Sequence, residues 1–190
     1  MTPTDLLAPD TALIVVDVQR DFCPGGALPV PEGDRVVPVL NDWIEAAQQA
    51  GALLVFSRDW HPHGHPSFMT EGGPWPEHCL QDTPGAAFHP DLHVPLEAYL
   101  VSKGTRFDKD QYSAFDDTGL AAFLDKRGVR RVILGGLARD VCVKATALDA
   151  RRAGLDVFLI DEAACALSPE AGREADQEMR AAGVAILQET

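Results

Sequence analysis

The chain has 190 residues, of which 46% are hydrophobic, so it can bury one sizeable core and is expected to form a single domain over 1–190. Its formal charge is −13, because 29 acidic residues outnumber 16 basic ones. Without a cluster of Lys and Arg to neutralise phosphates, nucleic acid and anionic membranes are poor partners. The N-terminus has no basic stretch followed by an apolar one, and no apolar run approaches the roughly 18 residues that span a bilayer. The four cysteines are widely spaced, so reduced thiols in a cytoplasmic protein are expected.

Short apolar runs rich in Val, Ile and Leu alternate with segments of helical periodicity along the chain. Continuous apolar runs predict strands that are buried on both faces, as parallel strands are. In chain order the predicted strands are 12–16, 52–56, 98–101, 132–134, 157–160 and 184–187. The predicted helices, each with a glycine just after its end, are 33–50, 116–127, 139–153 and 169–182. This order predicts an α/β fold with a six-stranded, mainly parallel sheet and helices on both faces, a Rossmann-type three-layer sandwich.

The segment 57–95 breaks this alternation. It is rich in Pro, Gly and His, shows no clear periodicity, and is far longer than an ordinary connection. A loop of this length inside a small domain is usually functional.

Four chemically capable side chains stand at or just beyond the ends of the first four apolar runs. They are Asp17, Asp59, Lys103 and Cys142. In open α/β sheets, ligands bind outside the carboxyl ends of the strands. We therefore expect these four residues to meet at one edge of the sheet.

Cys142 lies where a strand passes into the predicted helix 139–153. A single cysteine is commonly a buried and inert residue. At the start of a helix, however, the positive end of the dipole and the free N–H groups lower a thiol pKa, so a reactive thiolate is predicted. The same free amides would hold the oxyanion of a tetrahedral intermediate, and the backbone N–H groups of Ala138 and Cys142 are the expected donors.

Asp17 and Lys103 are less informative when each is taken alone. An acid after an apolar strand can simply bond a loop, and a lysine at a strand end is usually solvated. Together they make sense as a carboxylate that takes and returns a proton beside a cation that stabilises charge.

The loop also contains a potential metal site. Asp59 and His61 are two residues apart, so in an extended chain both side chains point the same way. Carboxylate oxygen and imidazole nitrogen suit Zn²⁺, Fe²⁺ or Mn²⁺. His65 and His78 are both available as a third ligand, and a His-rich surface loop is the competing interpretation.

Five motifs resemble the nicotinamidase branch of the isochorismatase-like cysteine hydrolases, and the resemblance runs from about residue 11 to the C-terminus. The motifs are VDVQRDF at 16–22, RDWHP at 58–62, GPWPEHC at 73–79, KG at 103–104, and GLA with the following Asp and CV at 136–143.

The resemblance implies an isochorismatase-like fold and a role for each matching residue. It implies a catalytic triad of Asp17, Lys103 and Cys142, and a cis peptide before Ala138 that turns the amides of Ala138 and Cys142 toward the oxyanion. It implies one divalent ion, Zn²⁺ as first choice, on metal ligands Asp59, His61 and His78, with His65 as a secondary ligand. It places the pyridine ring among Phe22, Trp75 and, as a weaker candidate, Tyr112. Arg139 departs from the pattern, because many relatives have a small hydroxyl residue there.

The expected activity is hydrolysis of nicotinamide to nicotinate and ammonia through a cysteine thioester, in NAD salvage. Two alternatives remain open: a related cysteine hydrolase of a carbamoyl or other small amide, and a metal-binding or redox-sensing module. The sequence leaves open the native metal, the turnover of pyrazinamide and the assembly of a homo-oligomer.

Overall fold

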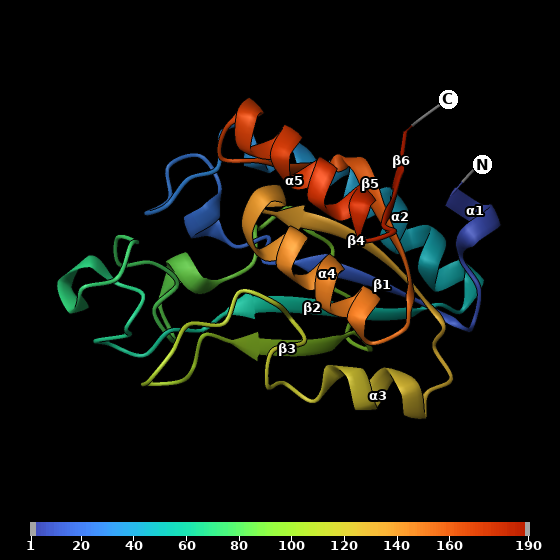
Figure 1. The fold of residues 1–190 in the computed structure, drawn as a ribbon, viewed down its shortest axis with the longest axis horizontal. Helices are drawn as coiled ribbons and strands as arrows, with labels where there is room; N and C mark the ends of the chain where they lie inside the picture. The colour runs from blue at the N-terminus through green and yellow to red at the C-terminus, as the bar shows by residue number, and fades with distance from the viewer. Residues whose placement is uncertain (1–2, 189–190) are drawn as a thin grey trace.

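Six strands form one parallel sheet in the computed structural model, which describes residues 3–188 (Figure 1). The strands are β1 Thr11–Val16, β2 Leu53–Asp59, β3 Tyr99–Lys103, β4 Arg131–Leu137, β5 Asp156–Cys165 and β6 Ala185–Leu187. All of their pairings are parallel, in the order β3-β2-β1-β4-β5-β6. The predicted six-stranded α/β sheet is thus confirmed.

The strand order reverses direction between β1 and β4. From β1 the chain moves outward through β2 to β3, then returns to pair β4 with β1 and continues outward through β5 to β6. At such a switch point the connections after the two central strands lead to opposite sides, which opens a crevice at the carboxyl edge.

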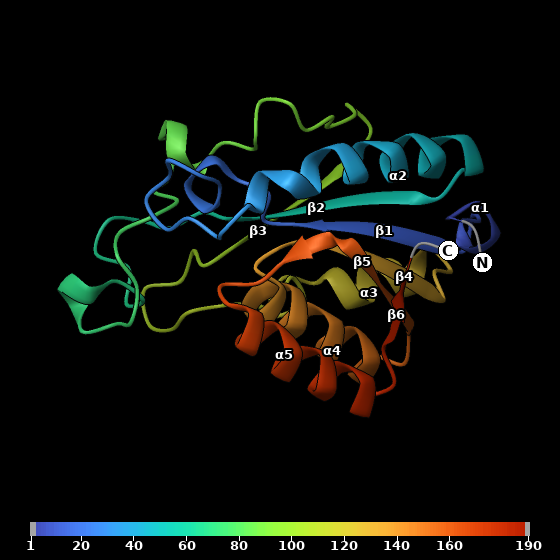
Figure 2. The same cartoon turned by 90° about the horizontal axis from the view of Figure 1, so that it is seen from above.

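The helices cover both faces of the sheet, as Figure 2 shows: α2 lies on one face, and α3, α4 and α5 lie on the other. Their bounds are α1 Pro3–Leu6, α2 Val36–Ala50, α3 Leu120–Lys126, α4 Lys144–Arg152 and α5 Pro169–Ala181. Short 3₁₀ turns cover Arg20–Phe22, Gly33–Arg35, Met69–Glu71 and Pro84–Ala86, and a π-helical turn covers Arg139–Val143.

The strand β1 is fully buried and supplies both cores. Its residues Leu13 and Val15 pack in the core beneath α2. Ile14 and Val16 pack in the other core, with residues of α3, α4 and α5. Successive side chains of a strand point to opposite faces, so a continuous apolar run is what a central strand between two helix layers requires.

The helix boundaries differ from the prediction mainly at the N-termini. The third helix starts at Leu120 rather than at 116, because Asp117 and Gly119 have φ values of 54° and 80°, which a right-handed helix does not accept. The helix expected over 139–153 begins with the π-helical turn, and α4 starts only at Lys144. The glycines that follow the four predicted helices all have positive φ, as expected: Gly51, Gly128, Gly154 and Gly183.

Several strands extend further toward the carboxyl edge than the apolar runs. Asp59 is the last residue of β2 and Lys103 the last of β3, and the two are register partners. The backbone ladder thus continues beyond the apolar residues and holds these two charged residues at the edge of the sheet.

The long connection between β2 and β3 is held by hydrogen bonds more than by regular structure. It contains the isolated bridges His61 to Leu80 and Phe68 to Trp75.

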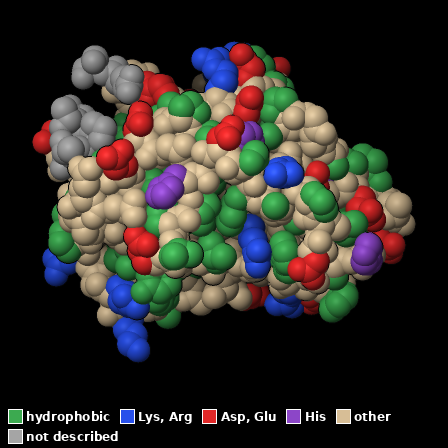
Figure 3. All heavy atoms as spheres, turned by 180° about the vertical axis from the view of Figure 1, so that it is seen from behind, with side chains coloured by type: hydrophobic (Ala, Val, Ile, Leu, Met, Phe, Trp, Pro, Cys, Tyr) green, Lys and Arg blue, Asp and Glu red, His purple; other side chains and the backbone are tan. Residues whose placement is uncertain are grey.

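On the face shown in Figure 3, the Lys and Arg side chains lie in small separate groups among acidic ones. Among residues 3–188, no helix is long and apolar enough to cross a membrane.

Candidate active site

Four adjacent strands each bring one reactive group to the carboxyl edge of the sheet. In the order β3, β2, β1 and β4, these groups are Lys103, Asp59, Asp17 and Cys142. The Lys103 Nζ lies 2.7 Å from Asp17 Oδ2 and 2.7 Å from Asp59 Oδ1. It also lies 3.4 Å from the Cys142 Sγ. The sheet therefore brings together the four residues that the strand ends predict.

Asp17 directly follows β1 and has a φ of 50°. This left-handed residue ends the strand, while its N–H still donates to the Ser57 carbonyl at 3.1 Å. The hydroxyl of Ser57 donates to Asp17 Oδ1 at 2.6 Å. With Oδ1 bonded to Ser57 and Oδ2 facing Lys103, the fully buried carboxylate is fixed beside the thiol.

Cys142 lies in the π-helical turn between β4 and α4. The Ala138 carbonyl accepts the N–H of Val141 at 3.0 Å and that of Val143 at 3.1 Å, the second bond spanning five residues. The peptide between Leu137 and Ala138 is cis, as the resemblance predicts. π-Helical turns of this kind are common at functional sites.

Burial and neighbouring charges act on the thiol pKa together with the helix end. Burial raises the pKa of Cys142 well above its usual value; Lys103 opposes this shift, while Asp17 and Asp59 add to it. The helix end therefore does not set the thiol pKa by itself, and the reactive thiolate depends on a base that takes the thiol proton. Burial, partly offset by Lys103, also raises the pKa of Asp17, which makes this carboxylate a stronger base for the thiol proton.

Lys103 remains a cation in this setting. Burial by itself lowers its pKa, but the neighbouring carboxylates Asp17 and Asp59 outweigh burial and raise it well above the usual value. A fully buried ammonium is stable only when it is paired and hydrogen-bonded in this way.

Asp59, His61 and His78 meet beside the thiol in a geometry that fits a metal ion. Asp59 Oδ2 lies 3.4 Å from His61 Nε2 and 3.7 Å from His78 Nε2. Tetrahedral zinc with ligands at 2.0–2.2 Å separates its ligand atoms by about 3.3 Å, so these distances suit an ion between the three groups. All three side chains are buried.

The other nitrogen of each imidazole fixes its tautomer. The Nδ1 of His61 lies 2.8 Å from the Gly104 carbonyl, and that of His78 lies 2.7 Å from the Pro76 carbonyl. Since a carbonyl only accepts, both Nδ1 atoms carry a proton, and in the neutral rings both Nε2 atoms present a lone pair. The buried His61 Nε2 has no hydrogen-bond partner, which is the condition of a metal ligand. Gly104 is required here, because a Cβ on it would lie 2.3 Å from the His61 ring.

His65 is buried beside His61, with ring centroids 4.2 Å apart. Its Nδ1 accepts the Ser67 N–H at 3.3 Å and lies 2.7 Å from the Ser67 hydroxyl. Burial lowers the His65 pKa to about 4, so the ring is neutral at pH 7. An accepting Nδ1 places the proton of the neutral ring on Nε2, and this buried nitrogen, like His61 Nε2, has no hydrogen-bond partner.

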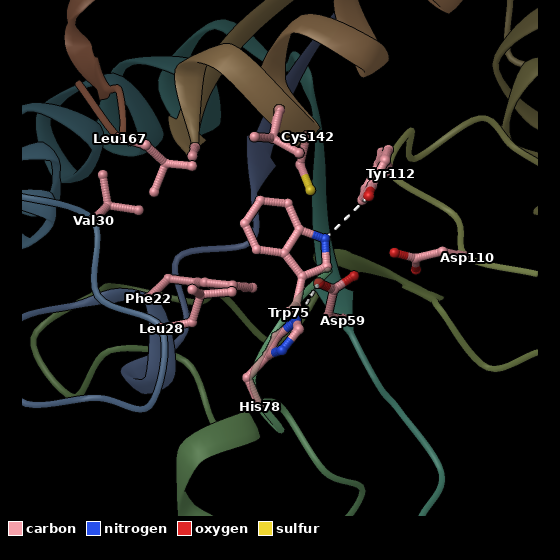
Figure 4. Close-up of a pocket in the computed structure, with 12 residues that line it drawn as sticks. Phe22, Leu28, Val30, Asp59, Trp75, His78, Asp110, Tyr112, Cys142 and Leu167 are labelled. Carbon is pink, nitrogen blue, oxygen red and sulfur yellow. Dashed lines mark hydrogen bonds and ion pairs between the residues drawn. The ribbon is translucent and has the colours of Figure 1, made fainter. Parts of the chain in front are cut away.

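These groups border a pocket, and Figure 4 shows the thiol of Cys142 pointing toward the Trp75 indole, with Asp59 and His78 drawn below that ring. The Trp75 indole donates from Nε1 to the Tyr112 hydroxyl at 3.0 Å. The structure thus brings the three aromatic residues predicted for the substrate into one pocket. Its lining consists of Phe22, Leu28, Val30, Asp59, Trp75, His78, Asp110, Tyr112, Ala138, Val141, Cys142 and Leu167.

Sequence reasoning missed the role of Gln19. Its Oε1 accepts the Asp59 N–H at 2.8 Å, and its Nε2 donates to the carbonyls of Asp59 and Ala86, both at 2.8 Å. The pairing of β1 with β2 ends at Val16, so the Gln19 amide takes over the hydrogen bonds that a further strand residue would make to Asp59. Gln19 is fully buried, and its place inside the first motif, VDVQRDF, is the sequence signal that points to it.

A doubly wound sheet with a thiol, a carboxylate and an ammonium at its switch point defines the class of this protein, an α/β fold equipped for nucleophilic chemistry. The chain belongs to the isochorismatase domain family, whose model matches residues 11–190.

Similar proteins match this chain over nearly its whole length. A nicotinamidase of Escherichia coli is 39% identical over 94% of this chain and 94% of its own length. The crystal structure of a pyrazinamidase of Pyrococcus horikoshii in complex with zinc has 50% identity and a TM-score of 0.92, over 95% of this chain and 100% of that one. PnC1 from L. infantum in complex with nicotinate has 38% identity and a TM-score of 0.89, over 96% of this chain and 94% of that one.

Proposed function

We propose that this protein is a cytoplasmic nicotinamidase, which hydrolyses nicotinamide to nicotinate and ammonia in NAD salvage. One observation carries the proposal: Asp59 turns one carboxylate oxygen to Lys103, beside the thiol, and the other to His61 and His78. A nucleophile and a metal site thus adjoin in one pocket. Nicotinamide has both groups that such a pocket would bind, a pyridine nitrogen for the metal side and a carboxamide for the thiol.

Cys142 is the proposed nucleophile, and Asp17 the proposed base. Asp17 takes the thiol proton as Sγ attacks the carboxamide carbon, and the carbonyl electron pair moves to oxygen. The amides of Ala138 and Cys142 donate to this oxyanion, and Lys103 stabilises the charge on Asp17 and sulfur. Asp17 then returns the proton to the departing ammonia, which leaves a thioester on Cys142. The same carboxylate takes a proton from water as the water oxygen attacks the thioester carbon; the C–S bond then breaks, Asp17 returns its proton to sulfur, and nicotinate leaves with its acid proton released to solvent.

Asp59, His61 and His78 are the proposed metal ligands, with His65 as a secondary one, and Zn²⁺ is the proposed ion ahead of Fe²⁺ or Mn²⁺. Bound there, the ion would supply a Lewis acid for the pyridine nitrogen and so orient the ring. Phe22, Trp75 and Tyr112 enclose the ring. We propose that residues 1–190 act as one hydrolase domain, with the loop 57–95 supplying the histidines.

The decisive test measures ammonia release from nicotinamide, with and without a chelator, for the wild type and Cys142→Ala. We expect Cys142→Ala to lose about 10⁴-fold or more in turnover, because no other group can form the thioester. Cys165→Ala is the matched control, since this thiol lies outside the pocket and should leave turnover unchanged. Near wild-type deamidation by Cys142→Ala would disprove the mechanism.

Chelation separates the remaining candidates. If metal removal leaves nicotinamide affinity and rate unchanged, the ring nitrogen is not held by a metal, and a carbamoyl or other small amide becomes the better substrate. If no ammonia is released from nicotinamide while Cys142 oxidises reversibly, the metal-binding or redox-sensing module is favoured.

A further inference from the structure

Arg139 lies directly after Ala138, yet its side chain is not part of the pocket lining. It is 8% exposed and points toward β5 and α5. Its Nε and Nη2 donate to the two carboxylate oxygens of Asp176 in α5, at 2.8 and 2.9 Å. This is the bidentate geometry in which a guanidinium binds a carboxylate most strongly.

The rest of the guanidinium binds β5. Nη2 donates to Asp161 Oδ1 at 2.7 Å, and Nη1 donates to the Asp161 carbonyl at 3.0 Å and to the Ala164 carbonyl at 3.4 Å. The contacts thus use all three nitrogens and join the turn to a strand and a helix that lie 22 to 37 residues further along the chain. A small hydroxyl side chain at this position is too short to reach either carboxylate.

The next residue ties the same turn to the same region. Asp140 Oδ1 accepts the N–H of Leu167 at 3.0 Å, in the connection between β5 and α5. Leu167 lines the pocket. Two consecutive side chains, Arg139 and Asp140, therefore connect the turn that carries Cys142 to β5, to α5 and to the connection between them.

We propose that Arg139 is a positioning residue, whose ion pairs with Asp161 and Asp176 hold the turn that carries the oxyanion donors Ala138 and Cys142. The inference rests on the proposed role of those amides, and it adds that this chain fixes them through β5 and α5. An oxyanion donor stabilises the transition state most when it is already in place before the reaction. Removing one donor typically costs about 10²- to 10³-fold in rate. A displacement of about 1 Å can cost about 10²-fold.

Two reactions of the same thiol test the proposal. Acetylation of Cys142 by p-nitrophenyl acetate forms a tetrahedral oxyanion, which collapses to the thioester and p-nitrophenolate. Alkylation by iodoacetamide forms the carbon–sulfur bond as iodide leaves, with no oxyanion; in both cases the thiol proton passes to Asp17. Mass spectrometry of the Cys142 peptide gives both rates separately from the other cysteines.

For Arg139→Ser we expect acetylation of Cys142 and kcat for nicotinamide to fall by about 10- to 100-fold, while alkylation and KM change less than about threefold. Arg139→Lys should recover part of the loss, because it keeps the charge without the bidentate contact. Asp176→Asn should give a smaller loss with the same selectivity, and it keeps the test valid if Arg139→Ser does not fold. Arg152→Ser, which removes an exposed arginine paired within α4, should match the wild type.

Equal losses in acetylation and alkylation would mean that Arg139 only maintains the fold, and no loss in either would mean that it positions nothing. Either result overturns the proposal. The ratio of the two rates does not depend on nicotinamide as the substrate, so it still decides the role of Arg139 if the wild type releases no ammonia from nicotinamide.

Discussion

The two halves of the site are built by different means. The nucleophile half consists of Asp17, Lys103 and Cys142, which come from the ends of β1 and β3 and from the turn after β4. The metal half takes only Asp59 from a strand, while His61 and His78 lie in the long loop and are oriented by the carbonyls of Gly104 and Pro76. The sheet therefore determines where the thiol chemistry lies, whereas local hydrogen bonds determine the ligand geometry.

Lys103 contacts both halves, so its removal should affect both activity and stability. Lys103→Met leaves Asp17 and Asp59 facing each other without the cation that both contact. We expect kcat/KM for nicotinamide to fall by about 10³-fold. The free energy of unfolding should fall by about 3–5 kcal/mol, as when one partner of a buried ion pair is removed. Steady-state kinetics and urea denaturation measure the two effects.

Lys109→Met is the matched control, because Lys109 pairs with Asp116 and Asp117 at the surface and should change neither quantity appreciably. Activity of Lys103→Met within tenfold of the wild type would show that the halves work without a shared cation.

His78→Ala should disable the metal half and spare the other. We expect zinc affinity, measured by competition with a chelating dye, to fall by at least about 100-fold. Iodoacetamide should still alkylate Cys142 within about threefold of the wild-type rate, because His78 does not contact the thiol trio. His63→Ala, an exposed histidine of the same loop, is the control. A parallel loss of zinc binding and thiol reactivity would contradict the division into halves.

Gln19→Ala should have the smallest effect on zinc affinity, and it tests whether the hydrogen bonds of Gln19 hold Asp59 in position. It leaves the Asp59 N–H and carbonyl without their side-chain partner, so we expect a loss of about 2–4 kcal/mol in unfolding free energy. Zinc affinity should fall by about 10-fold, because the ligand is displaced rather than removed. Gln49→Ala, on the exposed side of α2, should change neither quantity. Unchanged zinc affinity in Gln19→Ala would mean that β2 alone positions Asp59.

The sequence by itself determined the order of strands and helices and placed four chemically capable residues at the ends of the strands. Apolar runs and terminal glycines are local signals, since a buried parallel strand and a helix end have the same requirements in any protein. Because parallel strands end at one edge, Asp17, Asp59, Lys103 and Cys142 could be placed together before any contact was known.

Tertiary structure decided what these groups do to one another. The raised thiol pKa comes from burial and from two carboxylates on other strands, neither of which the helix start reveals. Gln19 and Arg139 form hydrogen bonds with partners 22 to 67 residues away, so these contacts depend on register and packing. Local patterns specify which elements form, whereas charge states and supporting contacts arise only once the elements have packed.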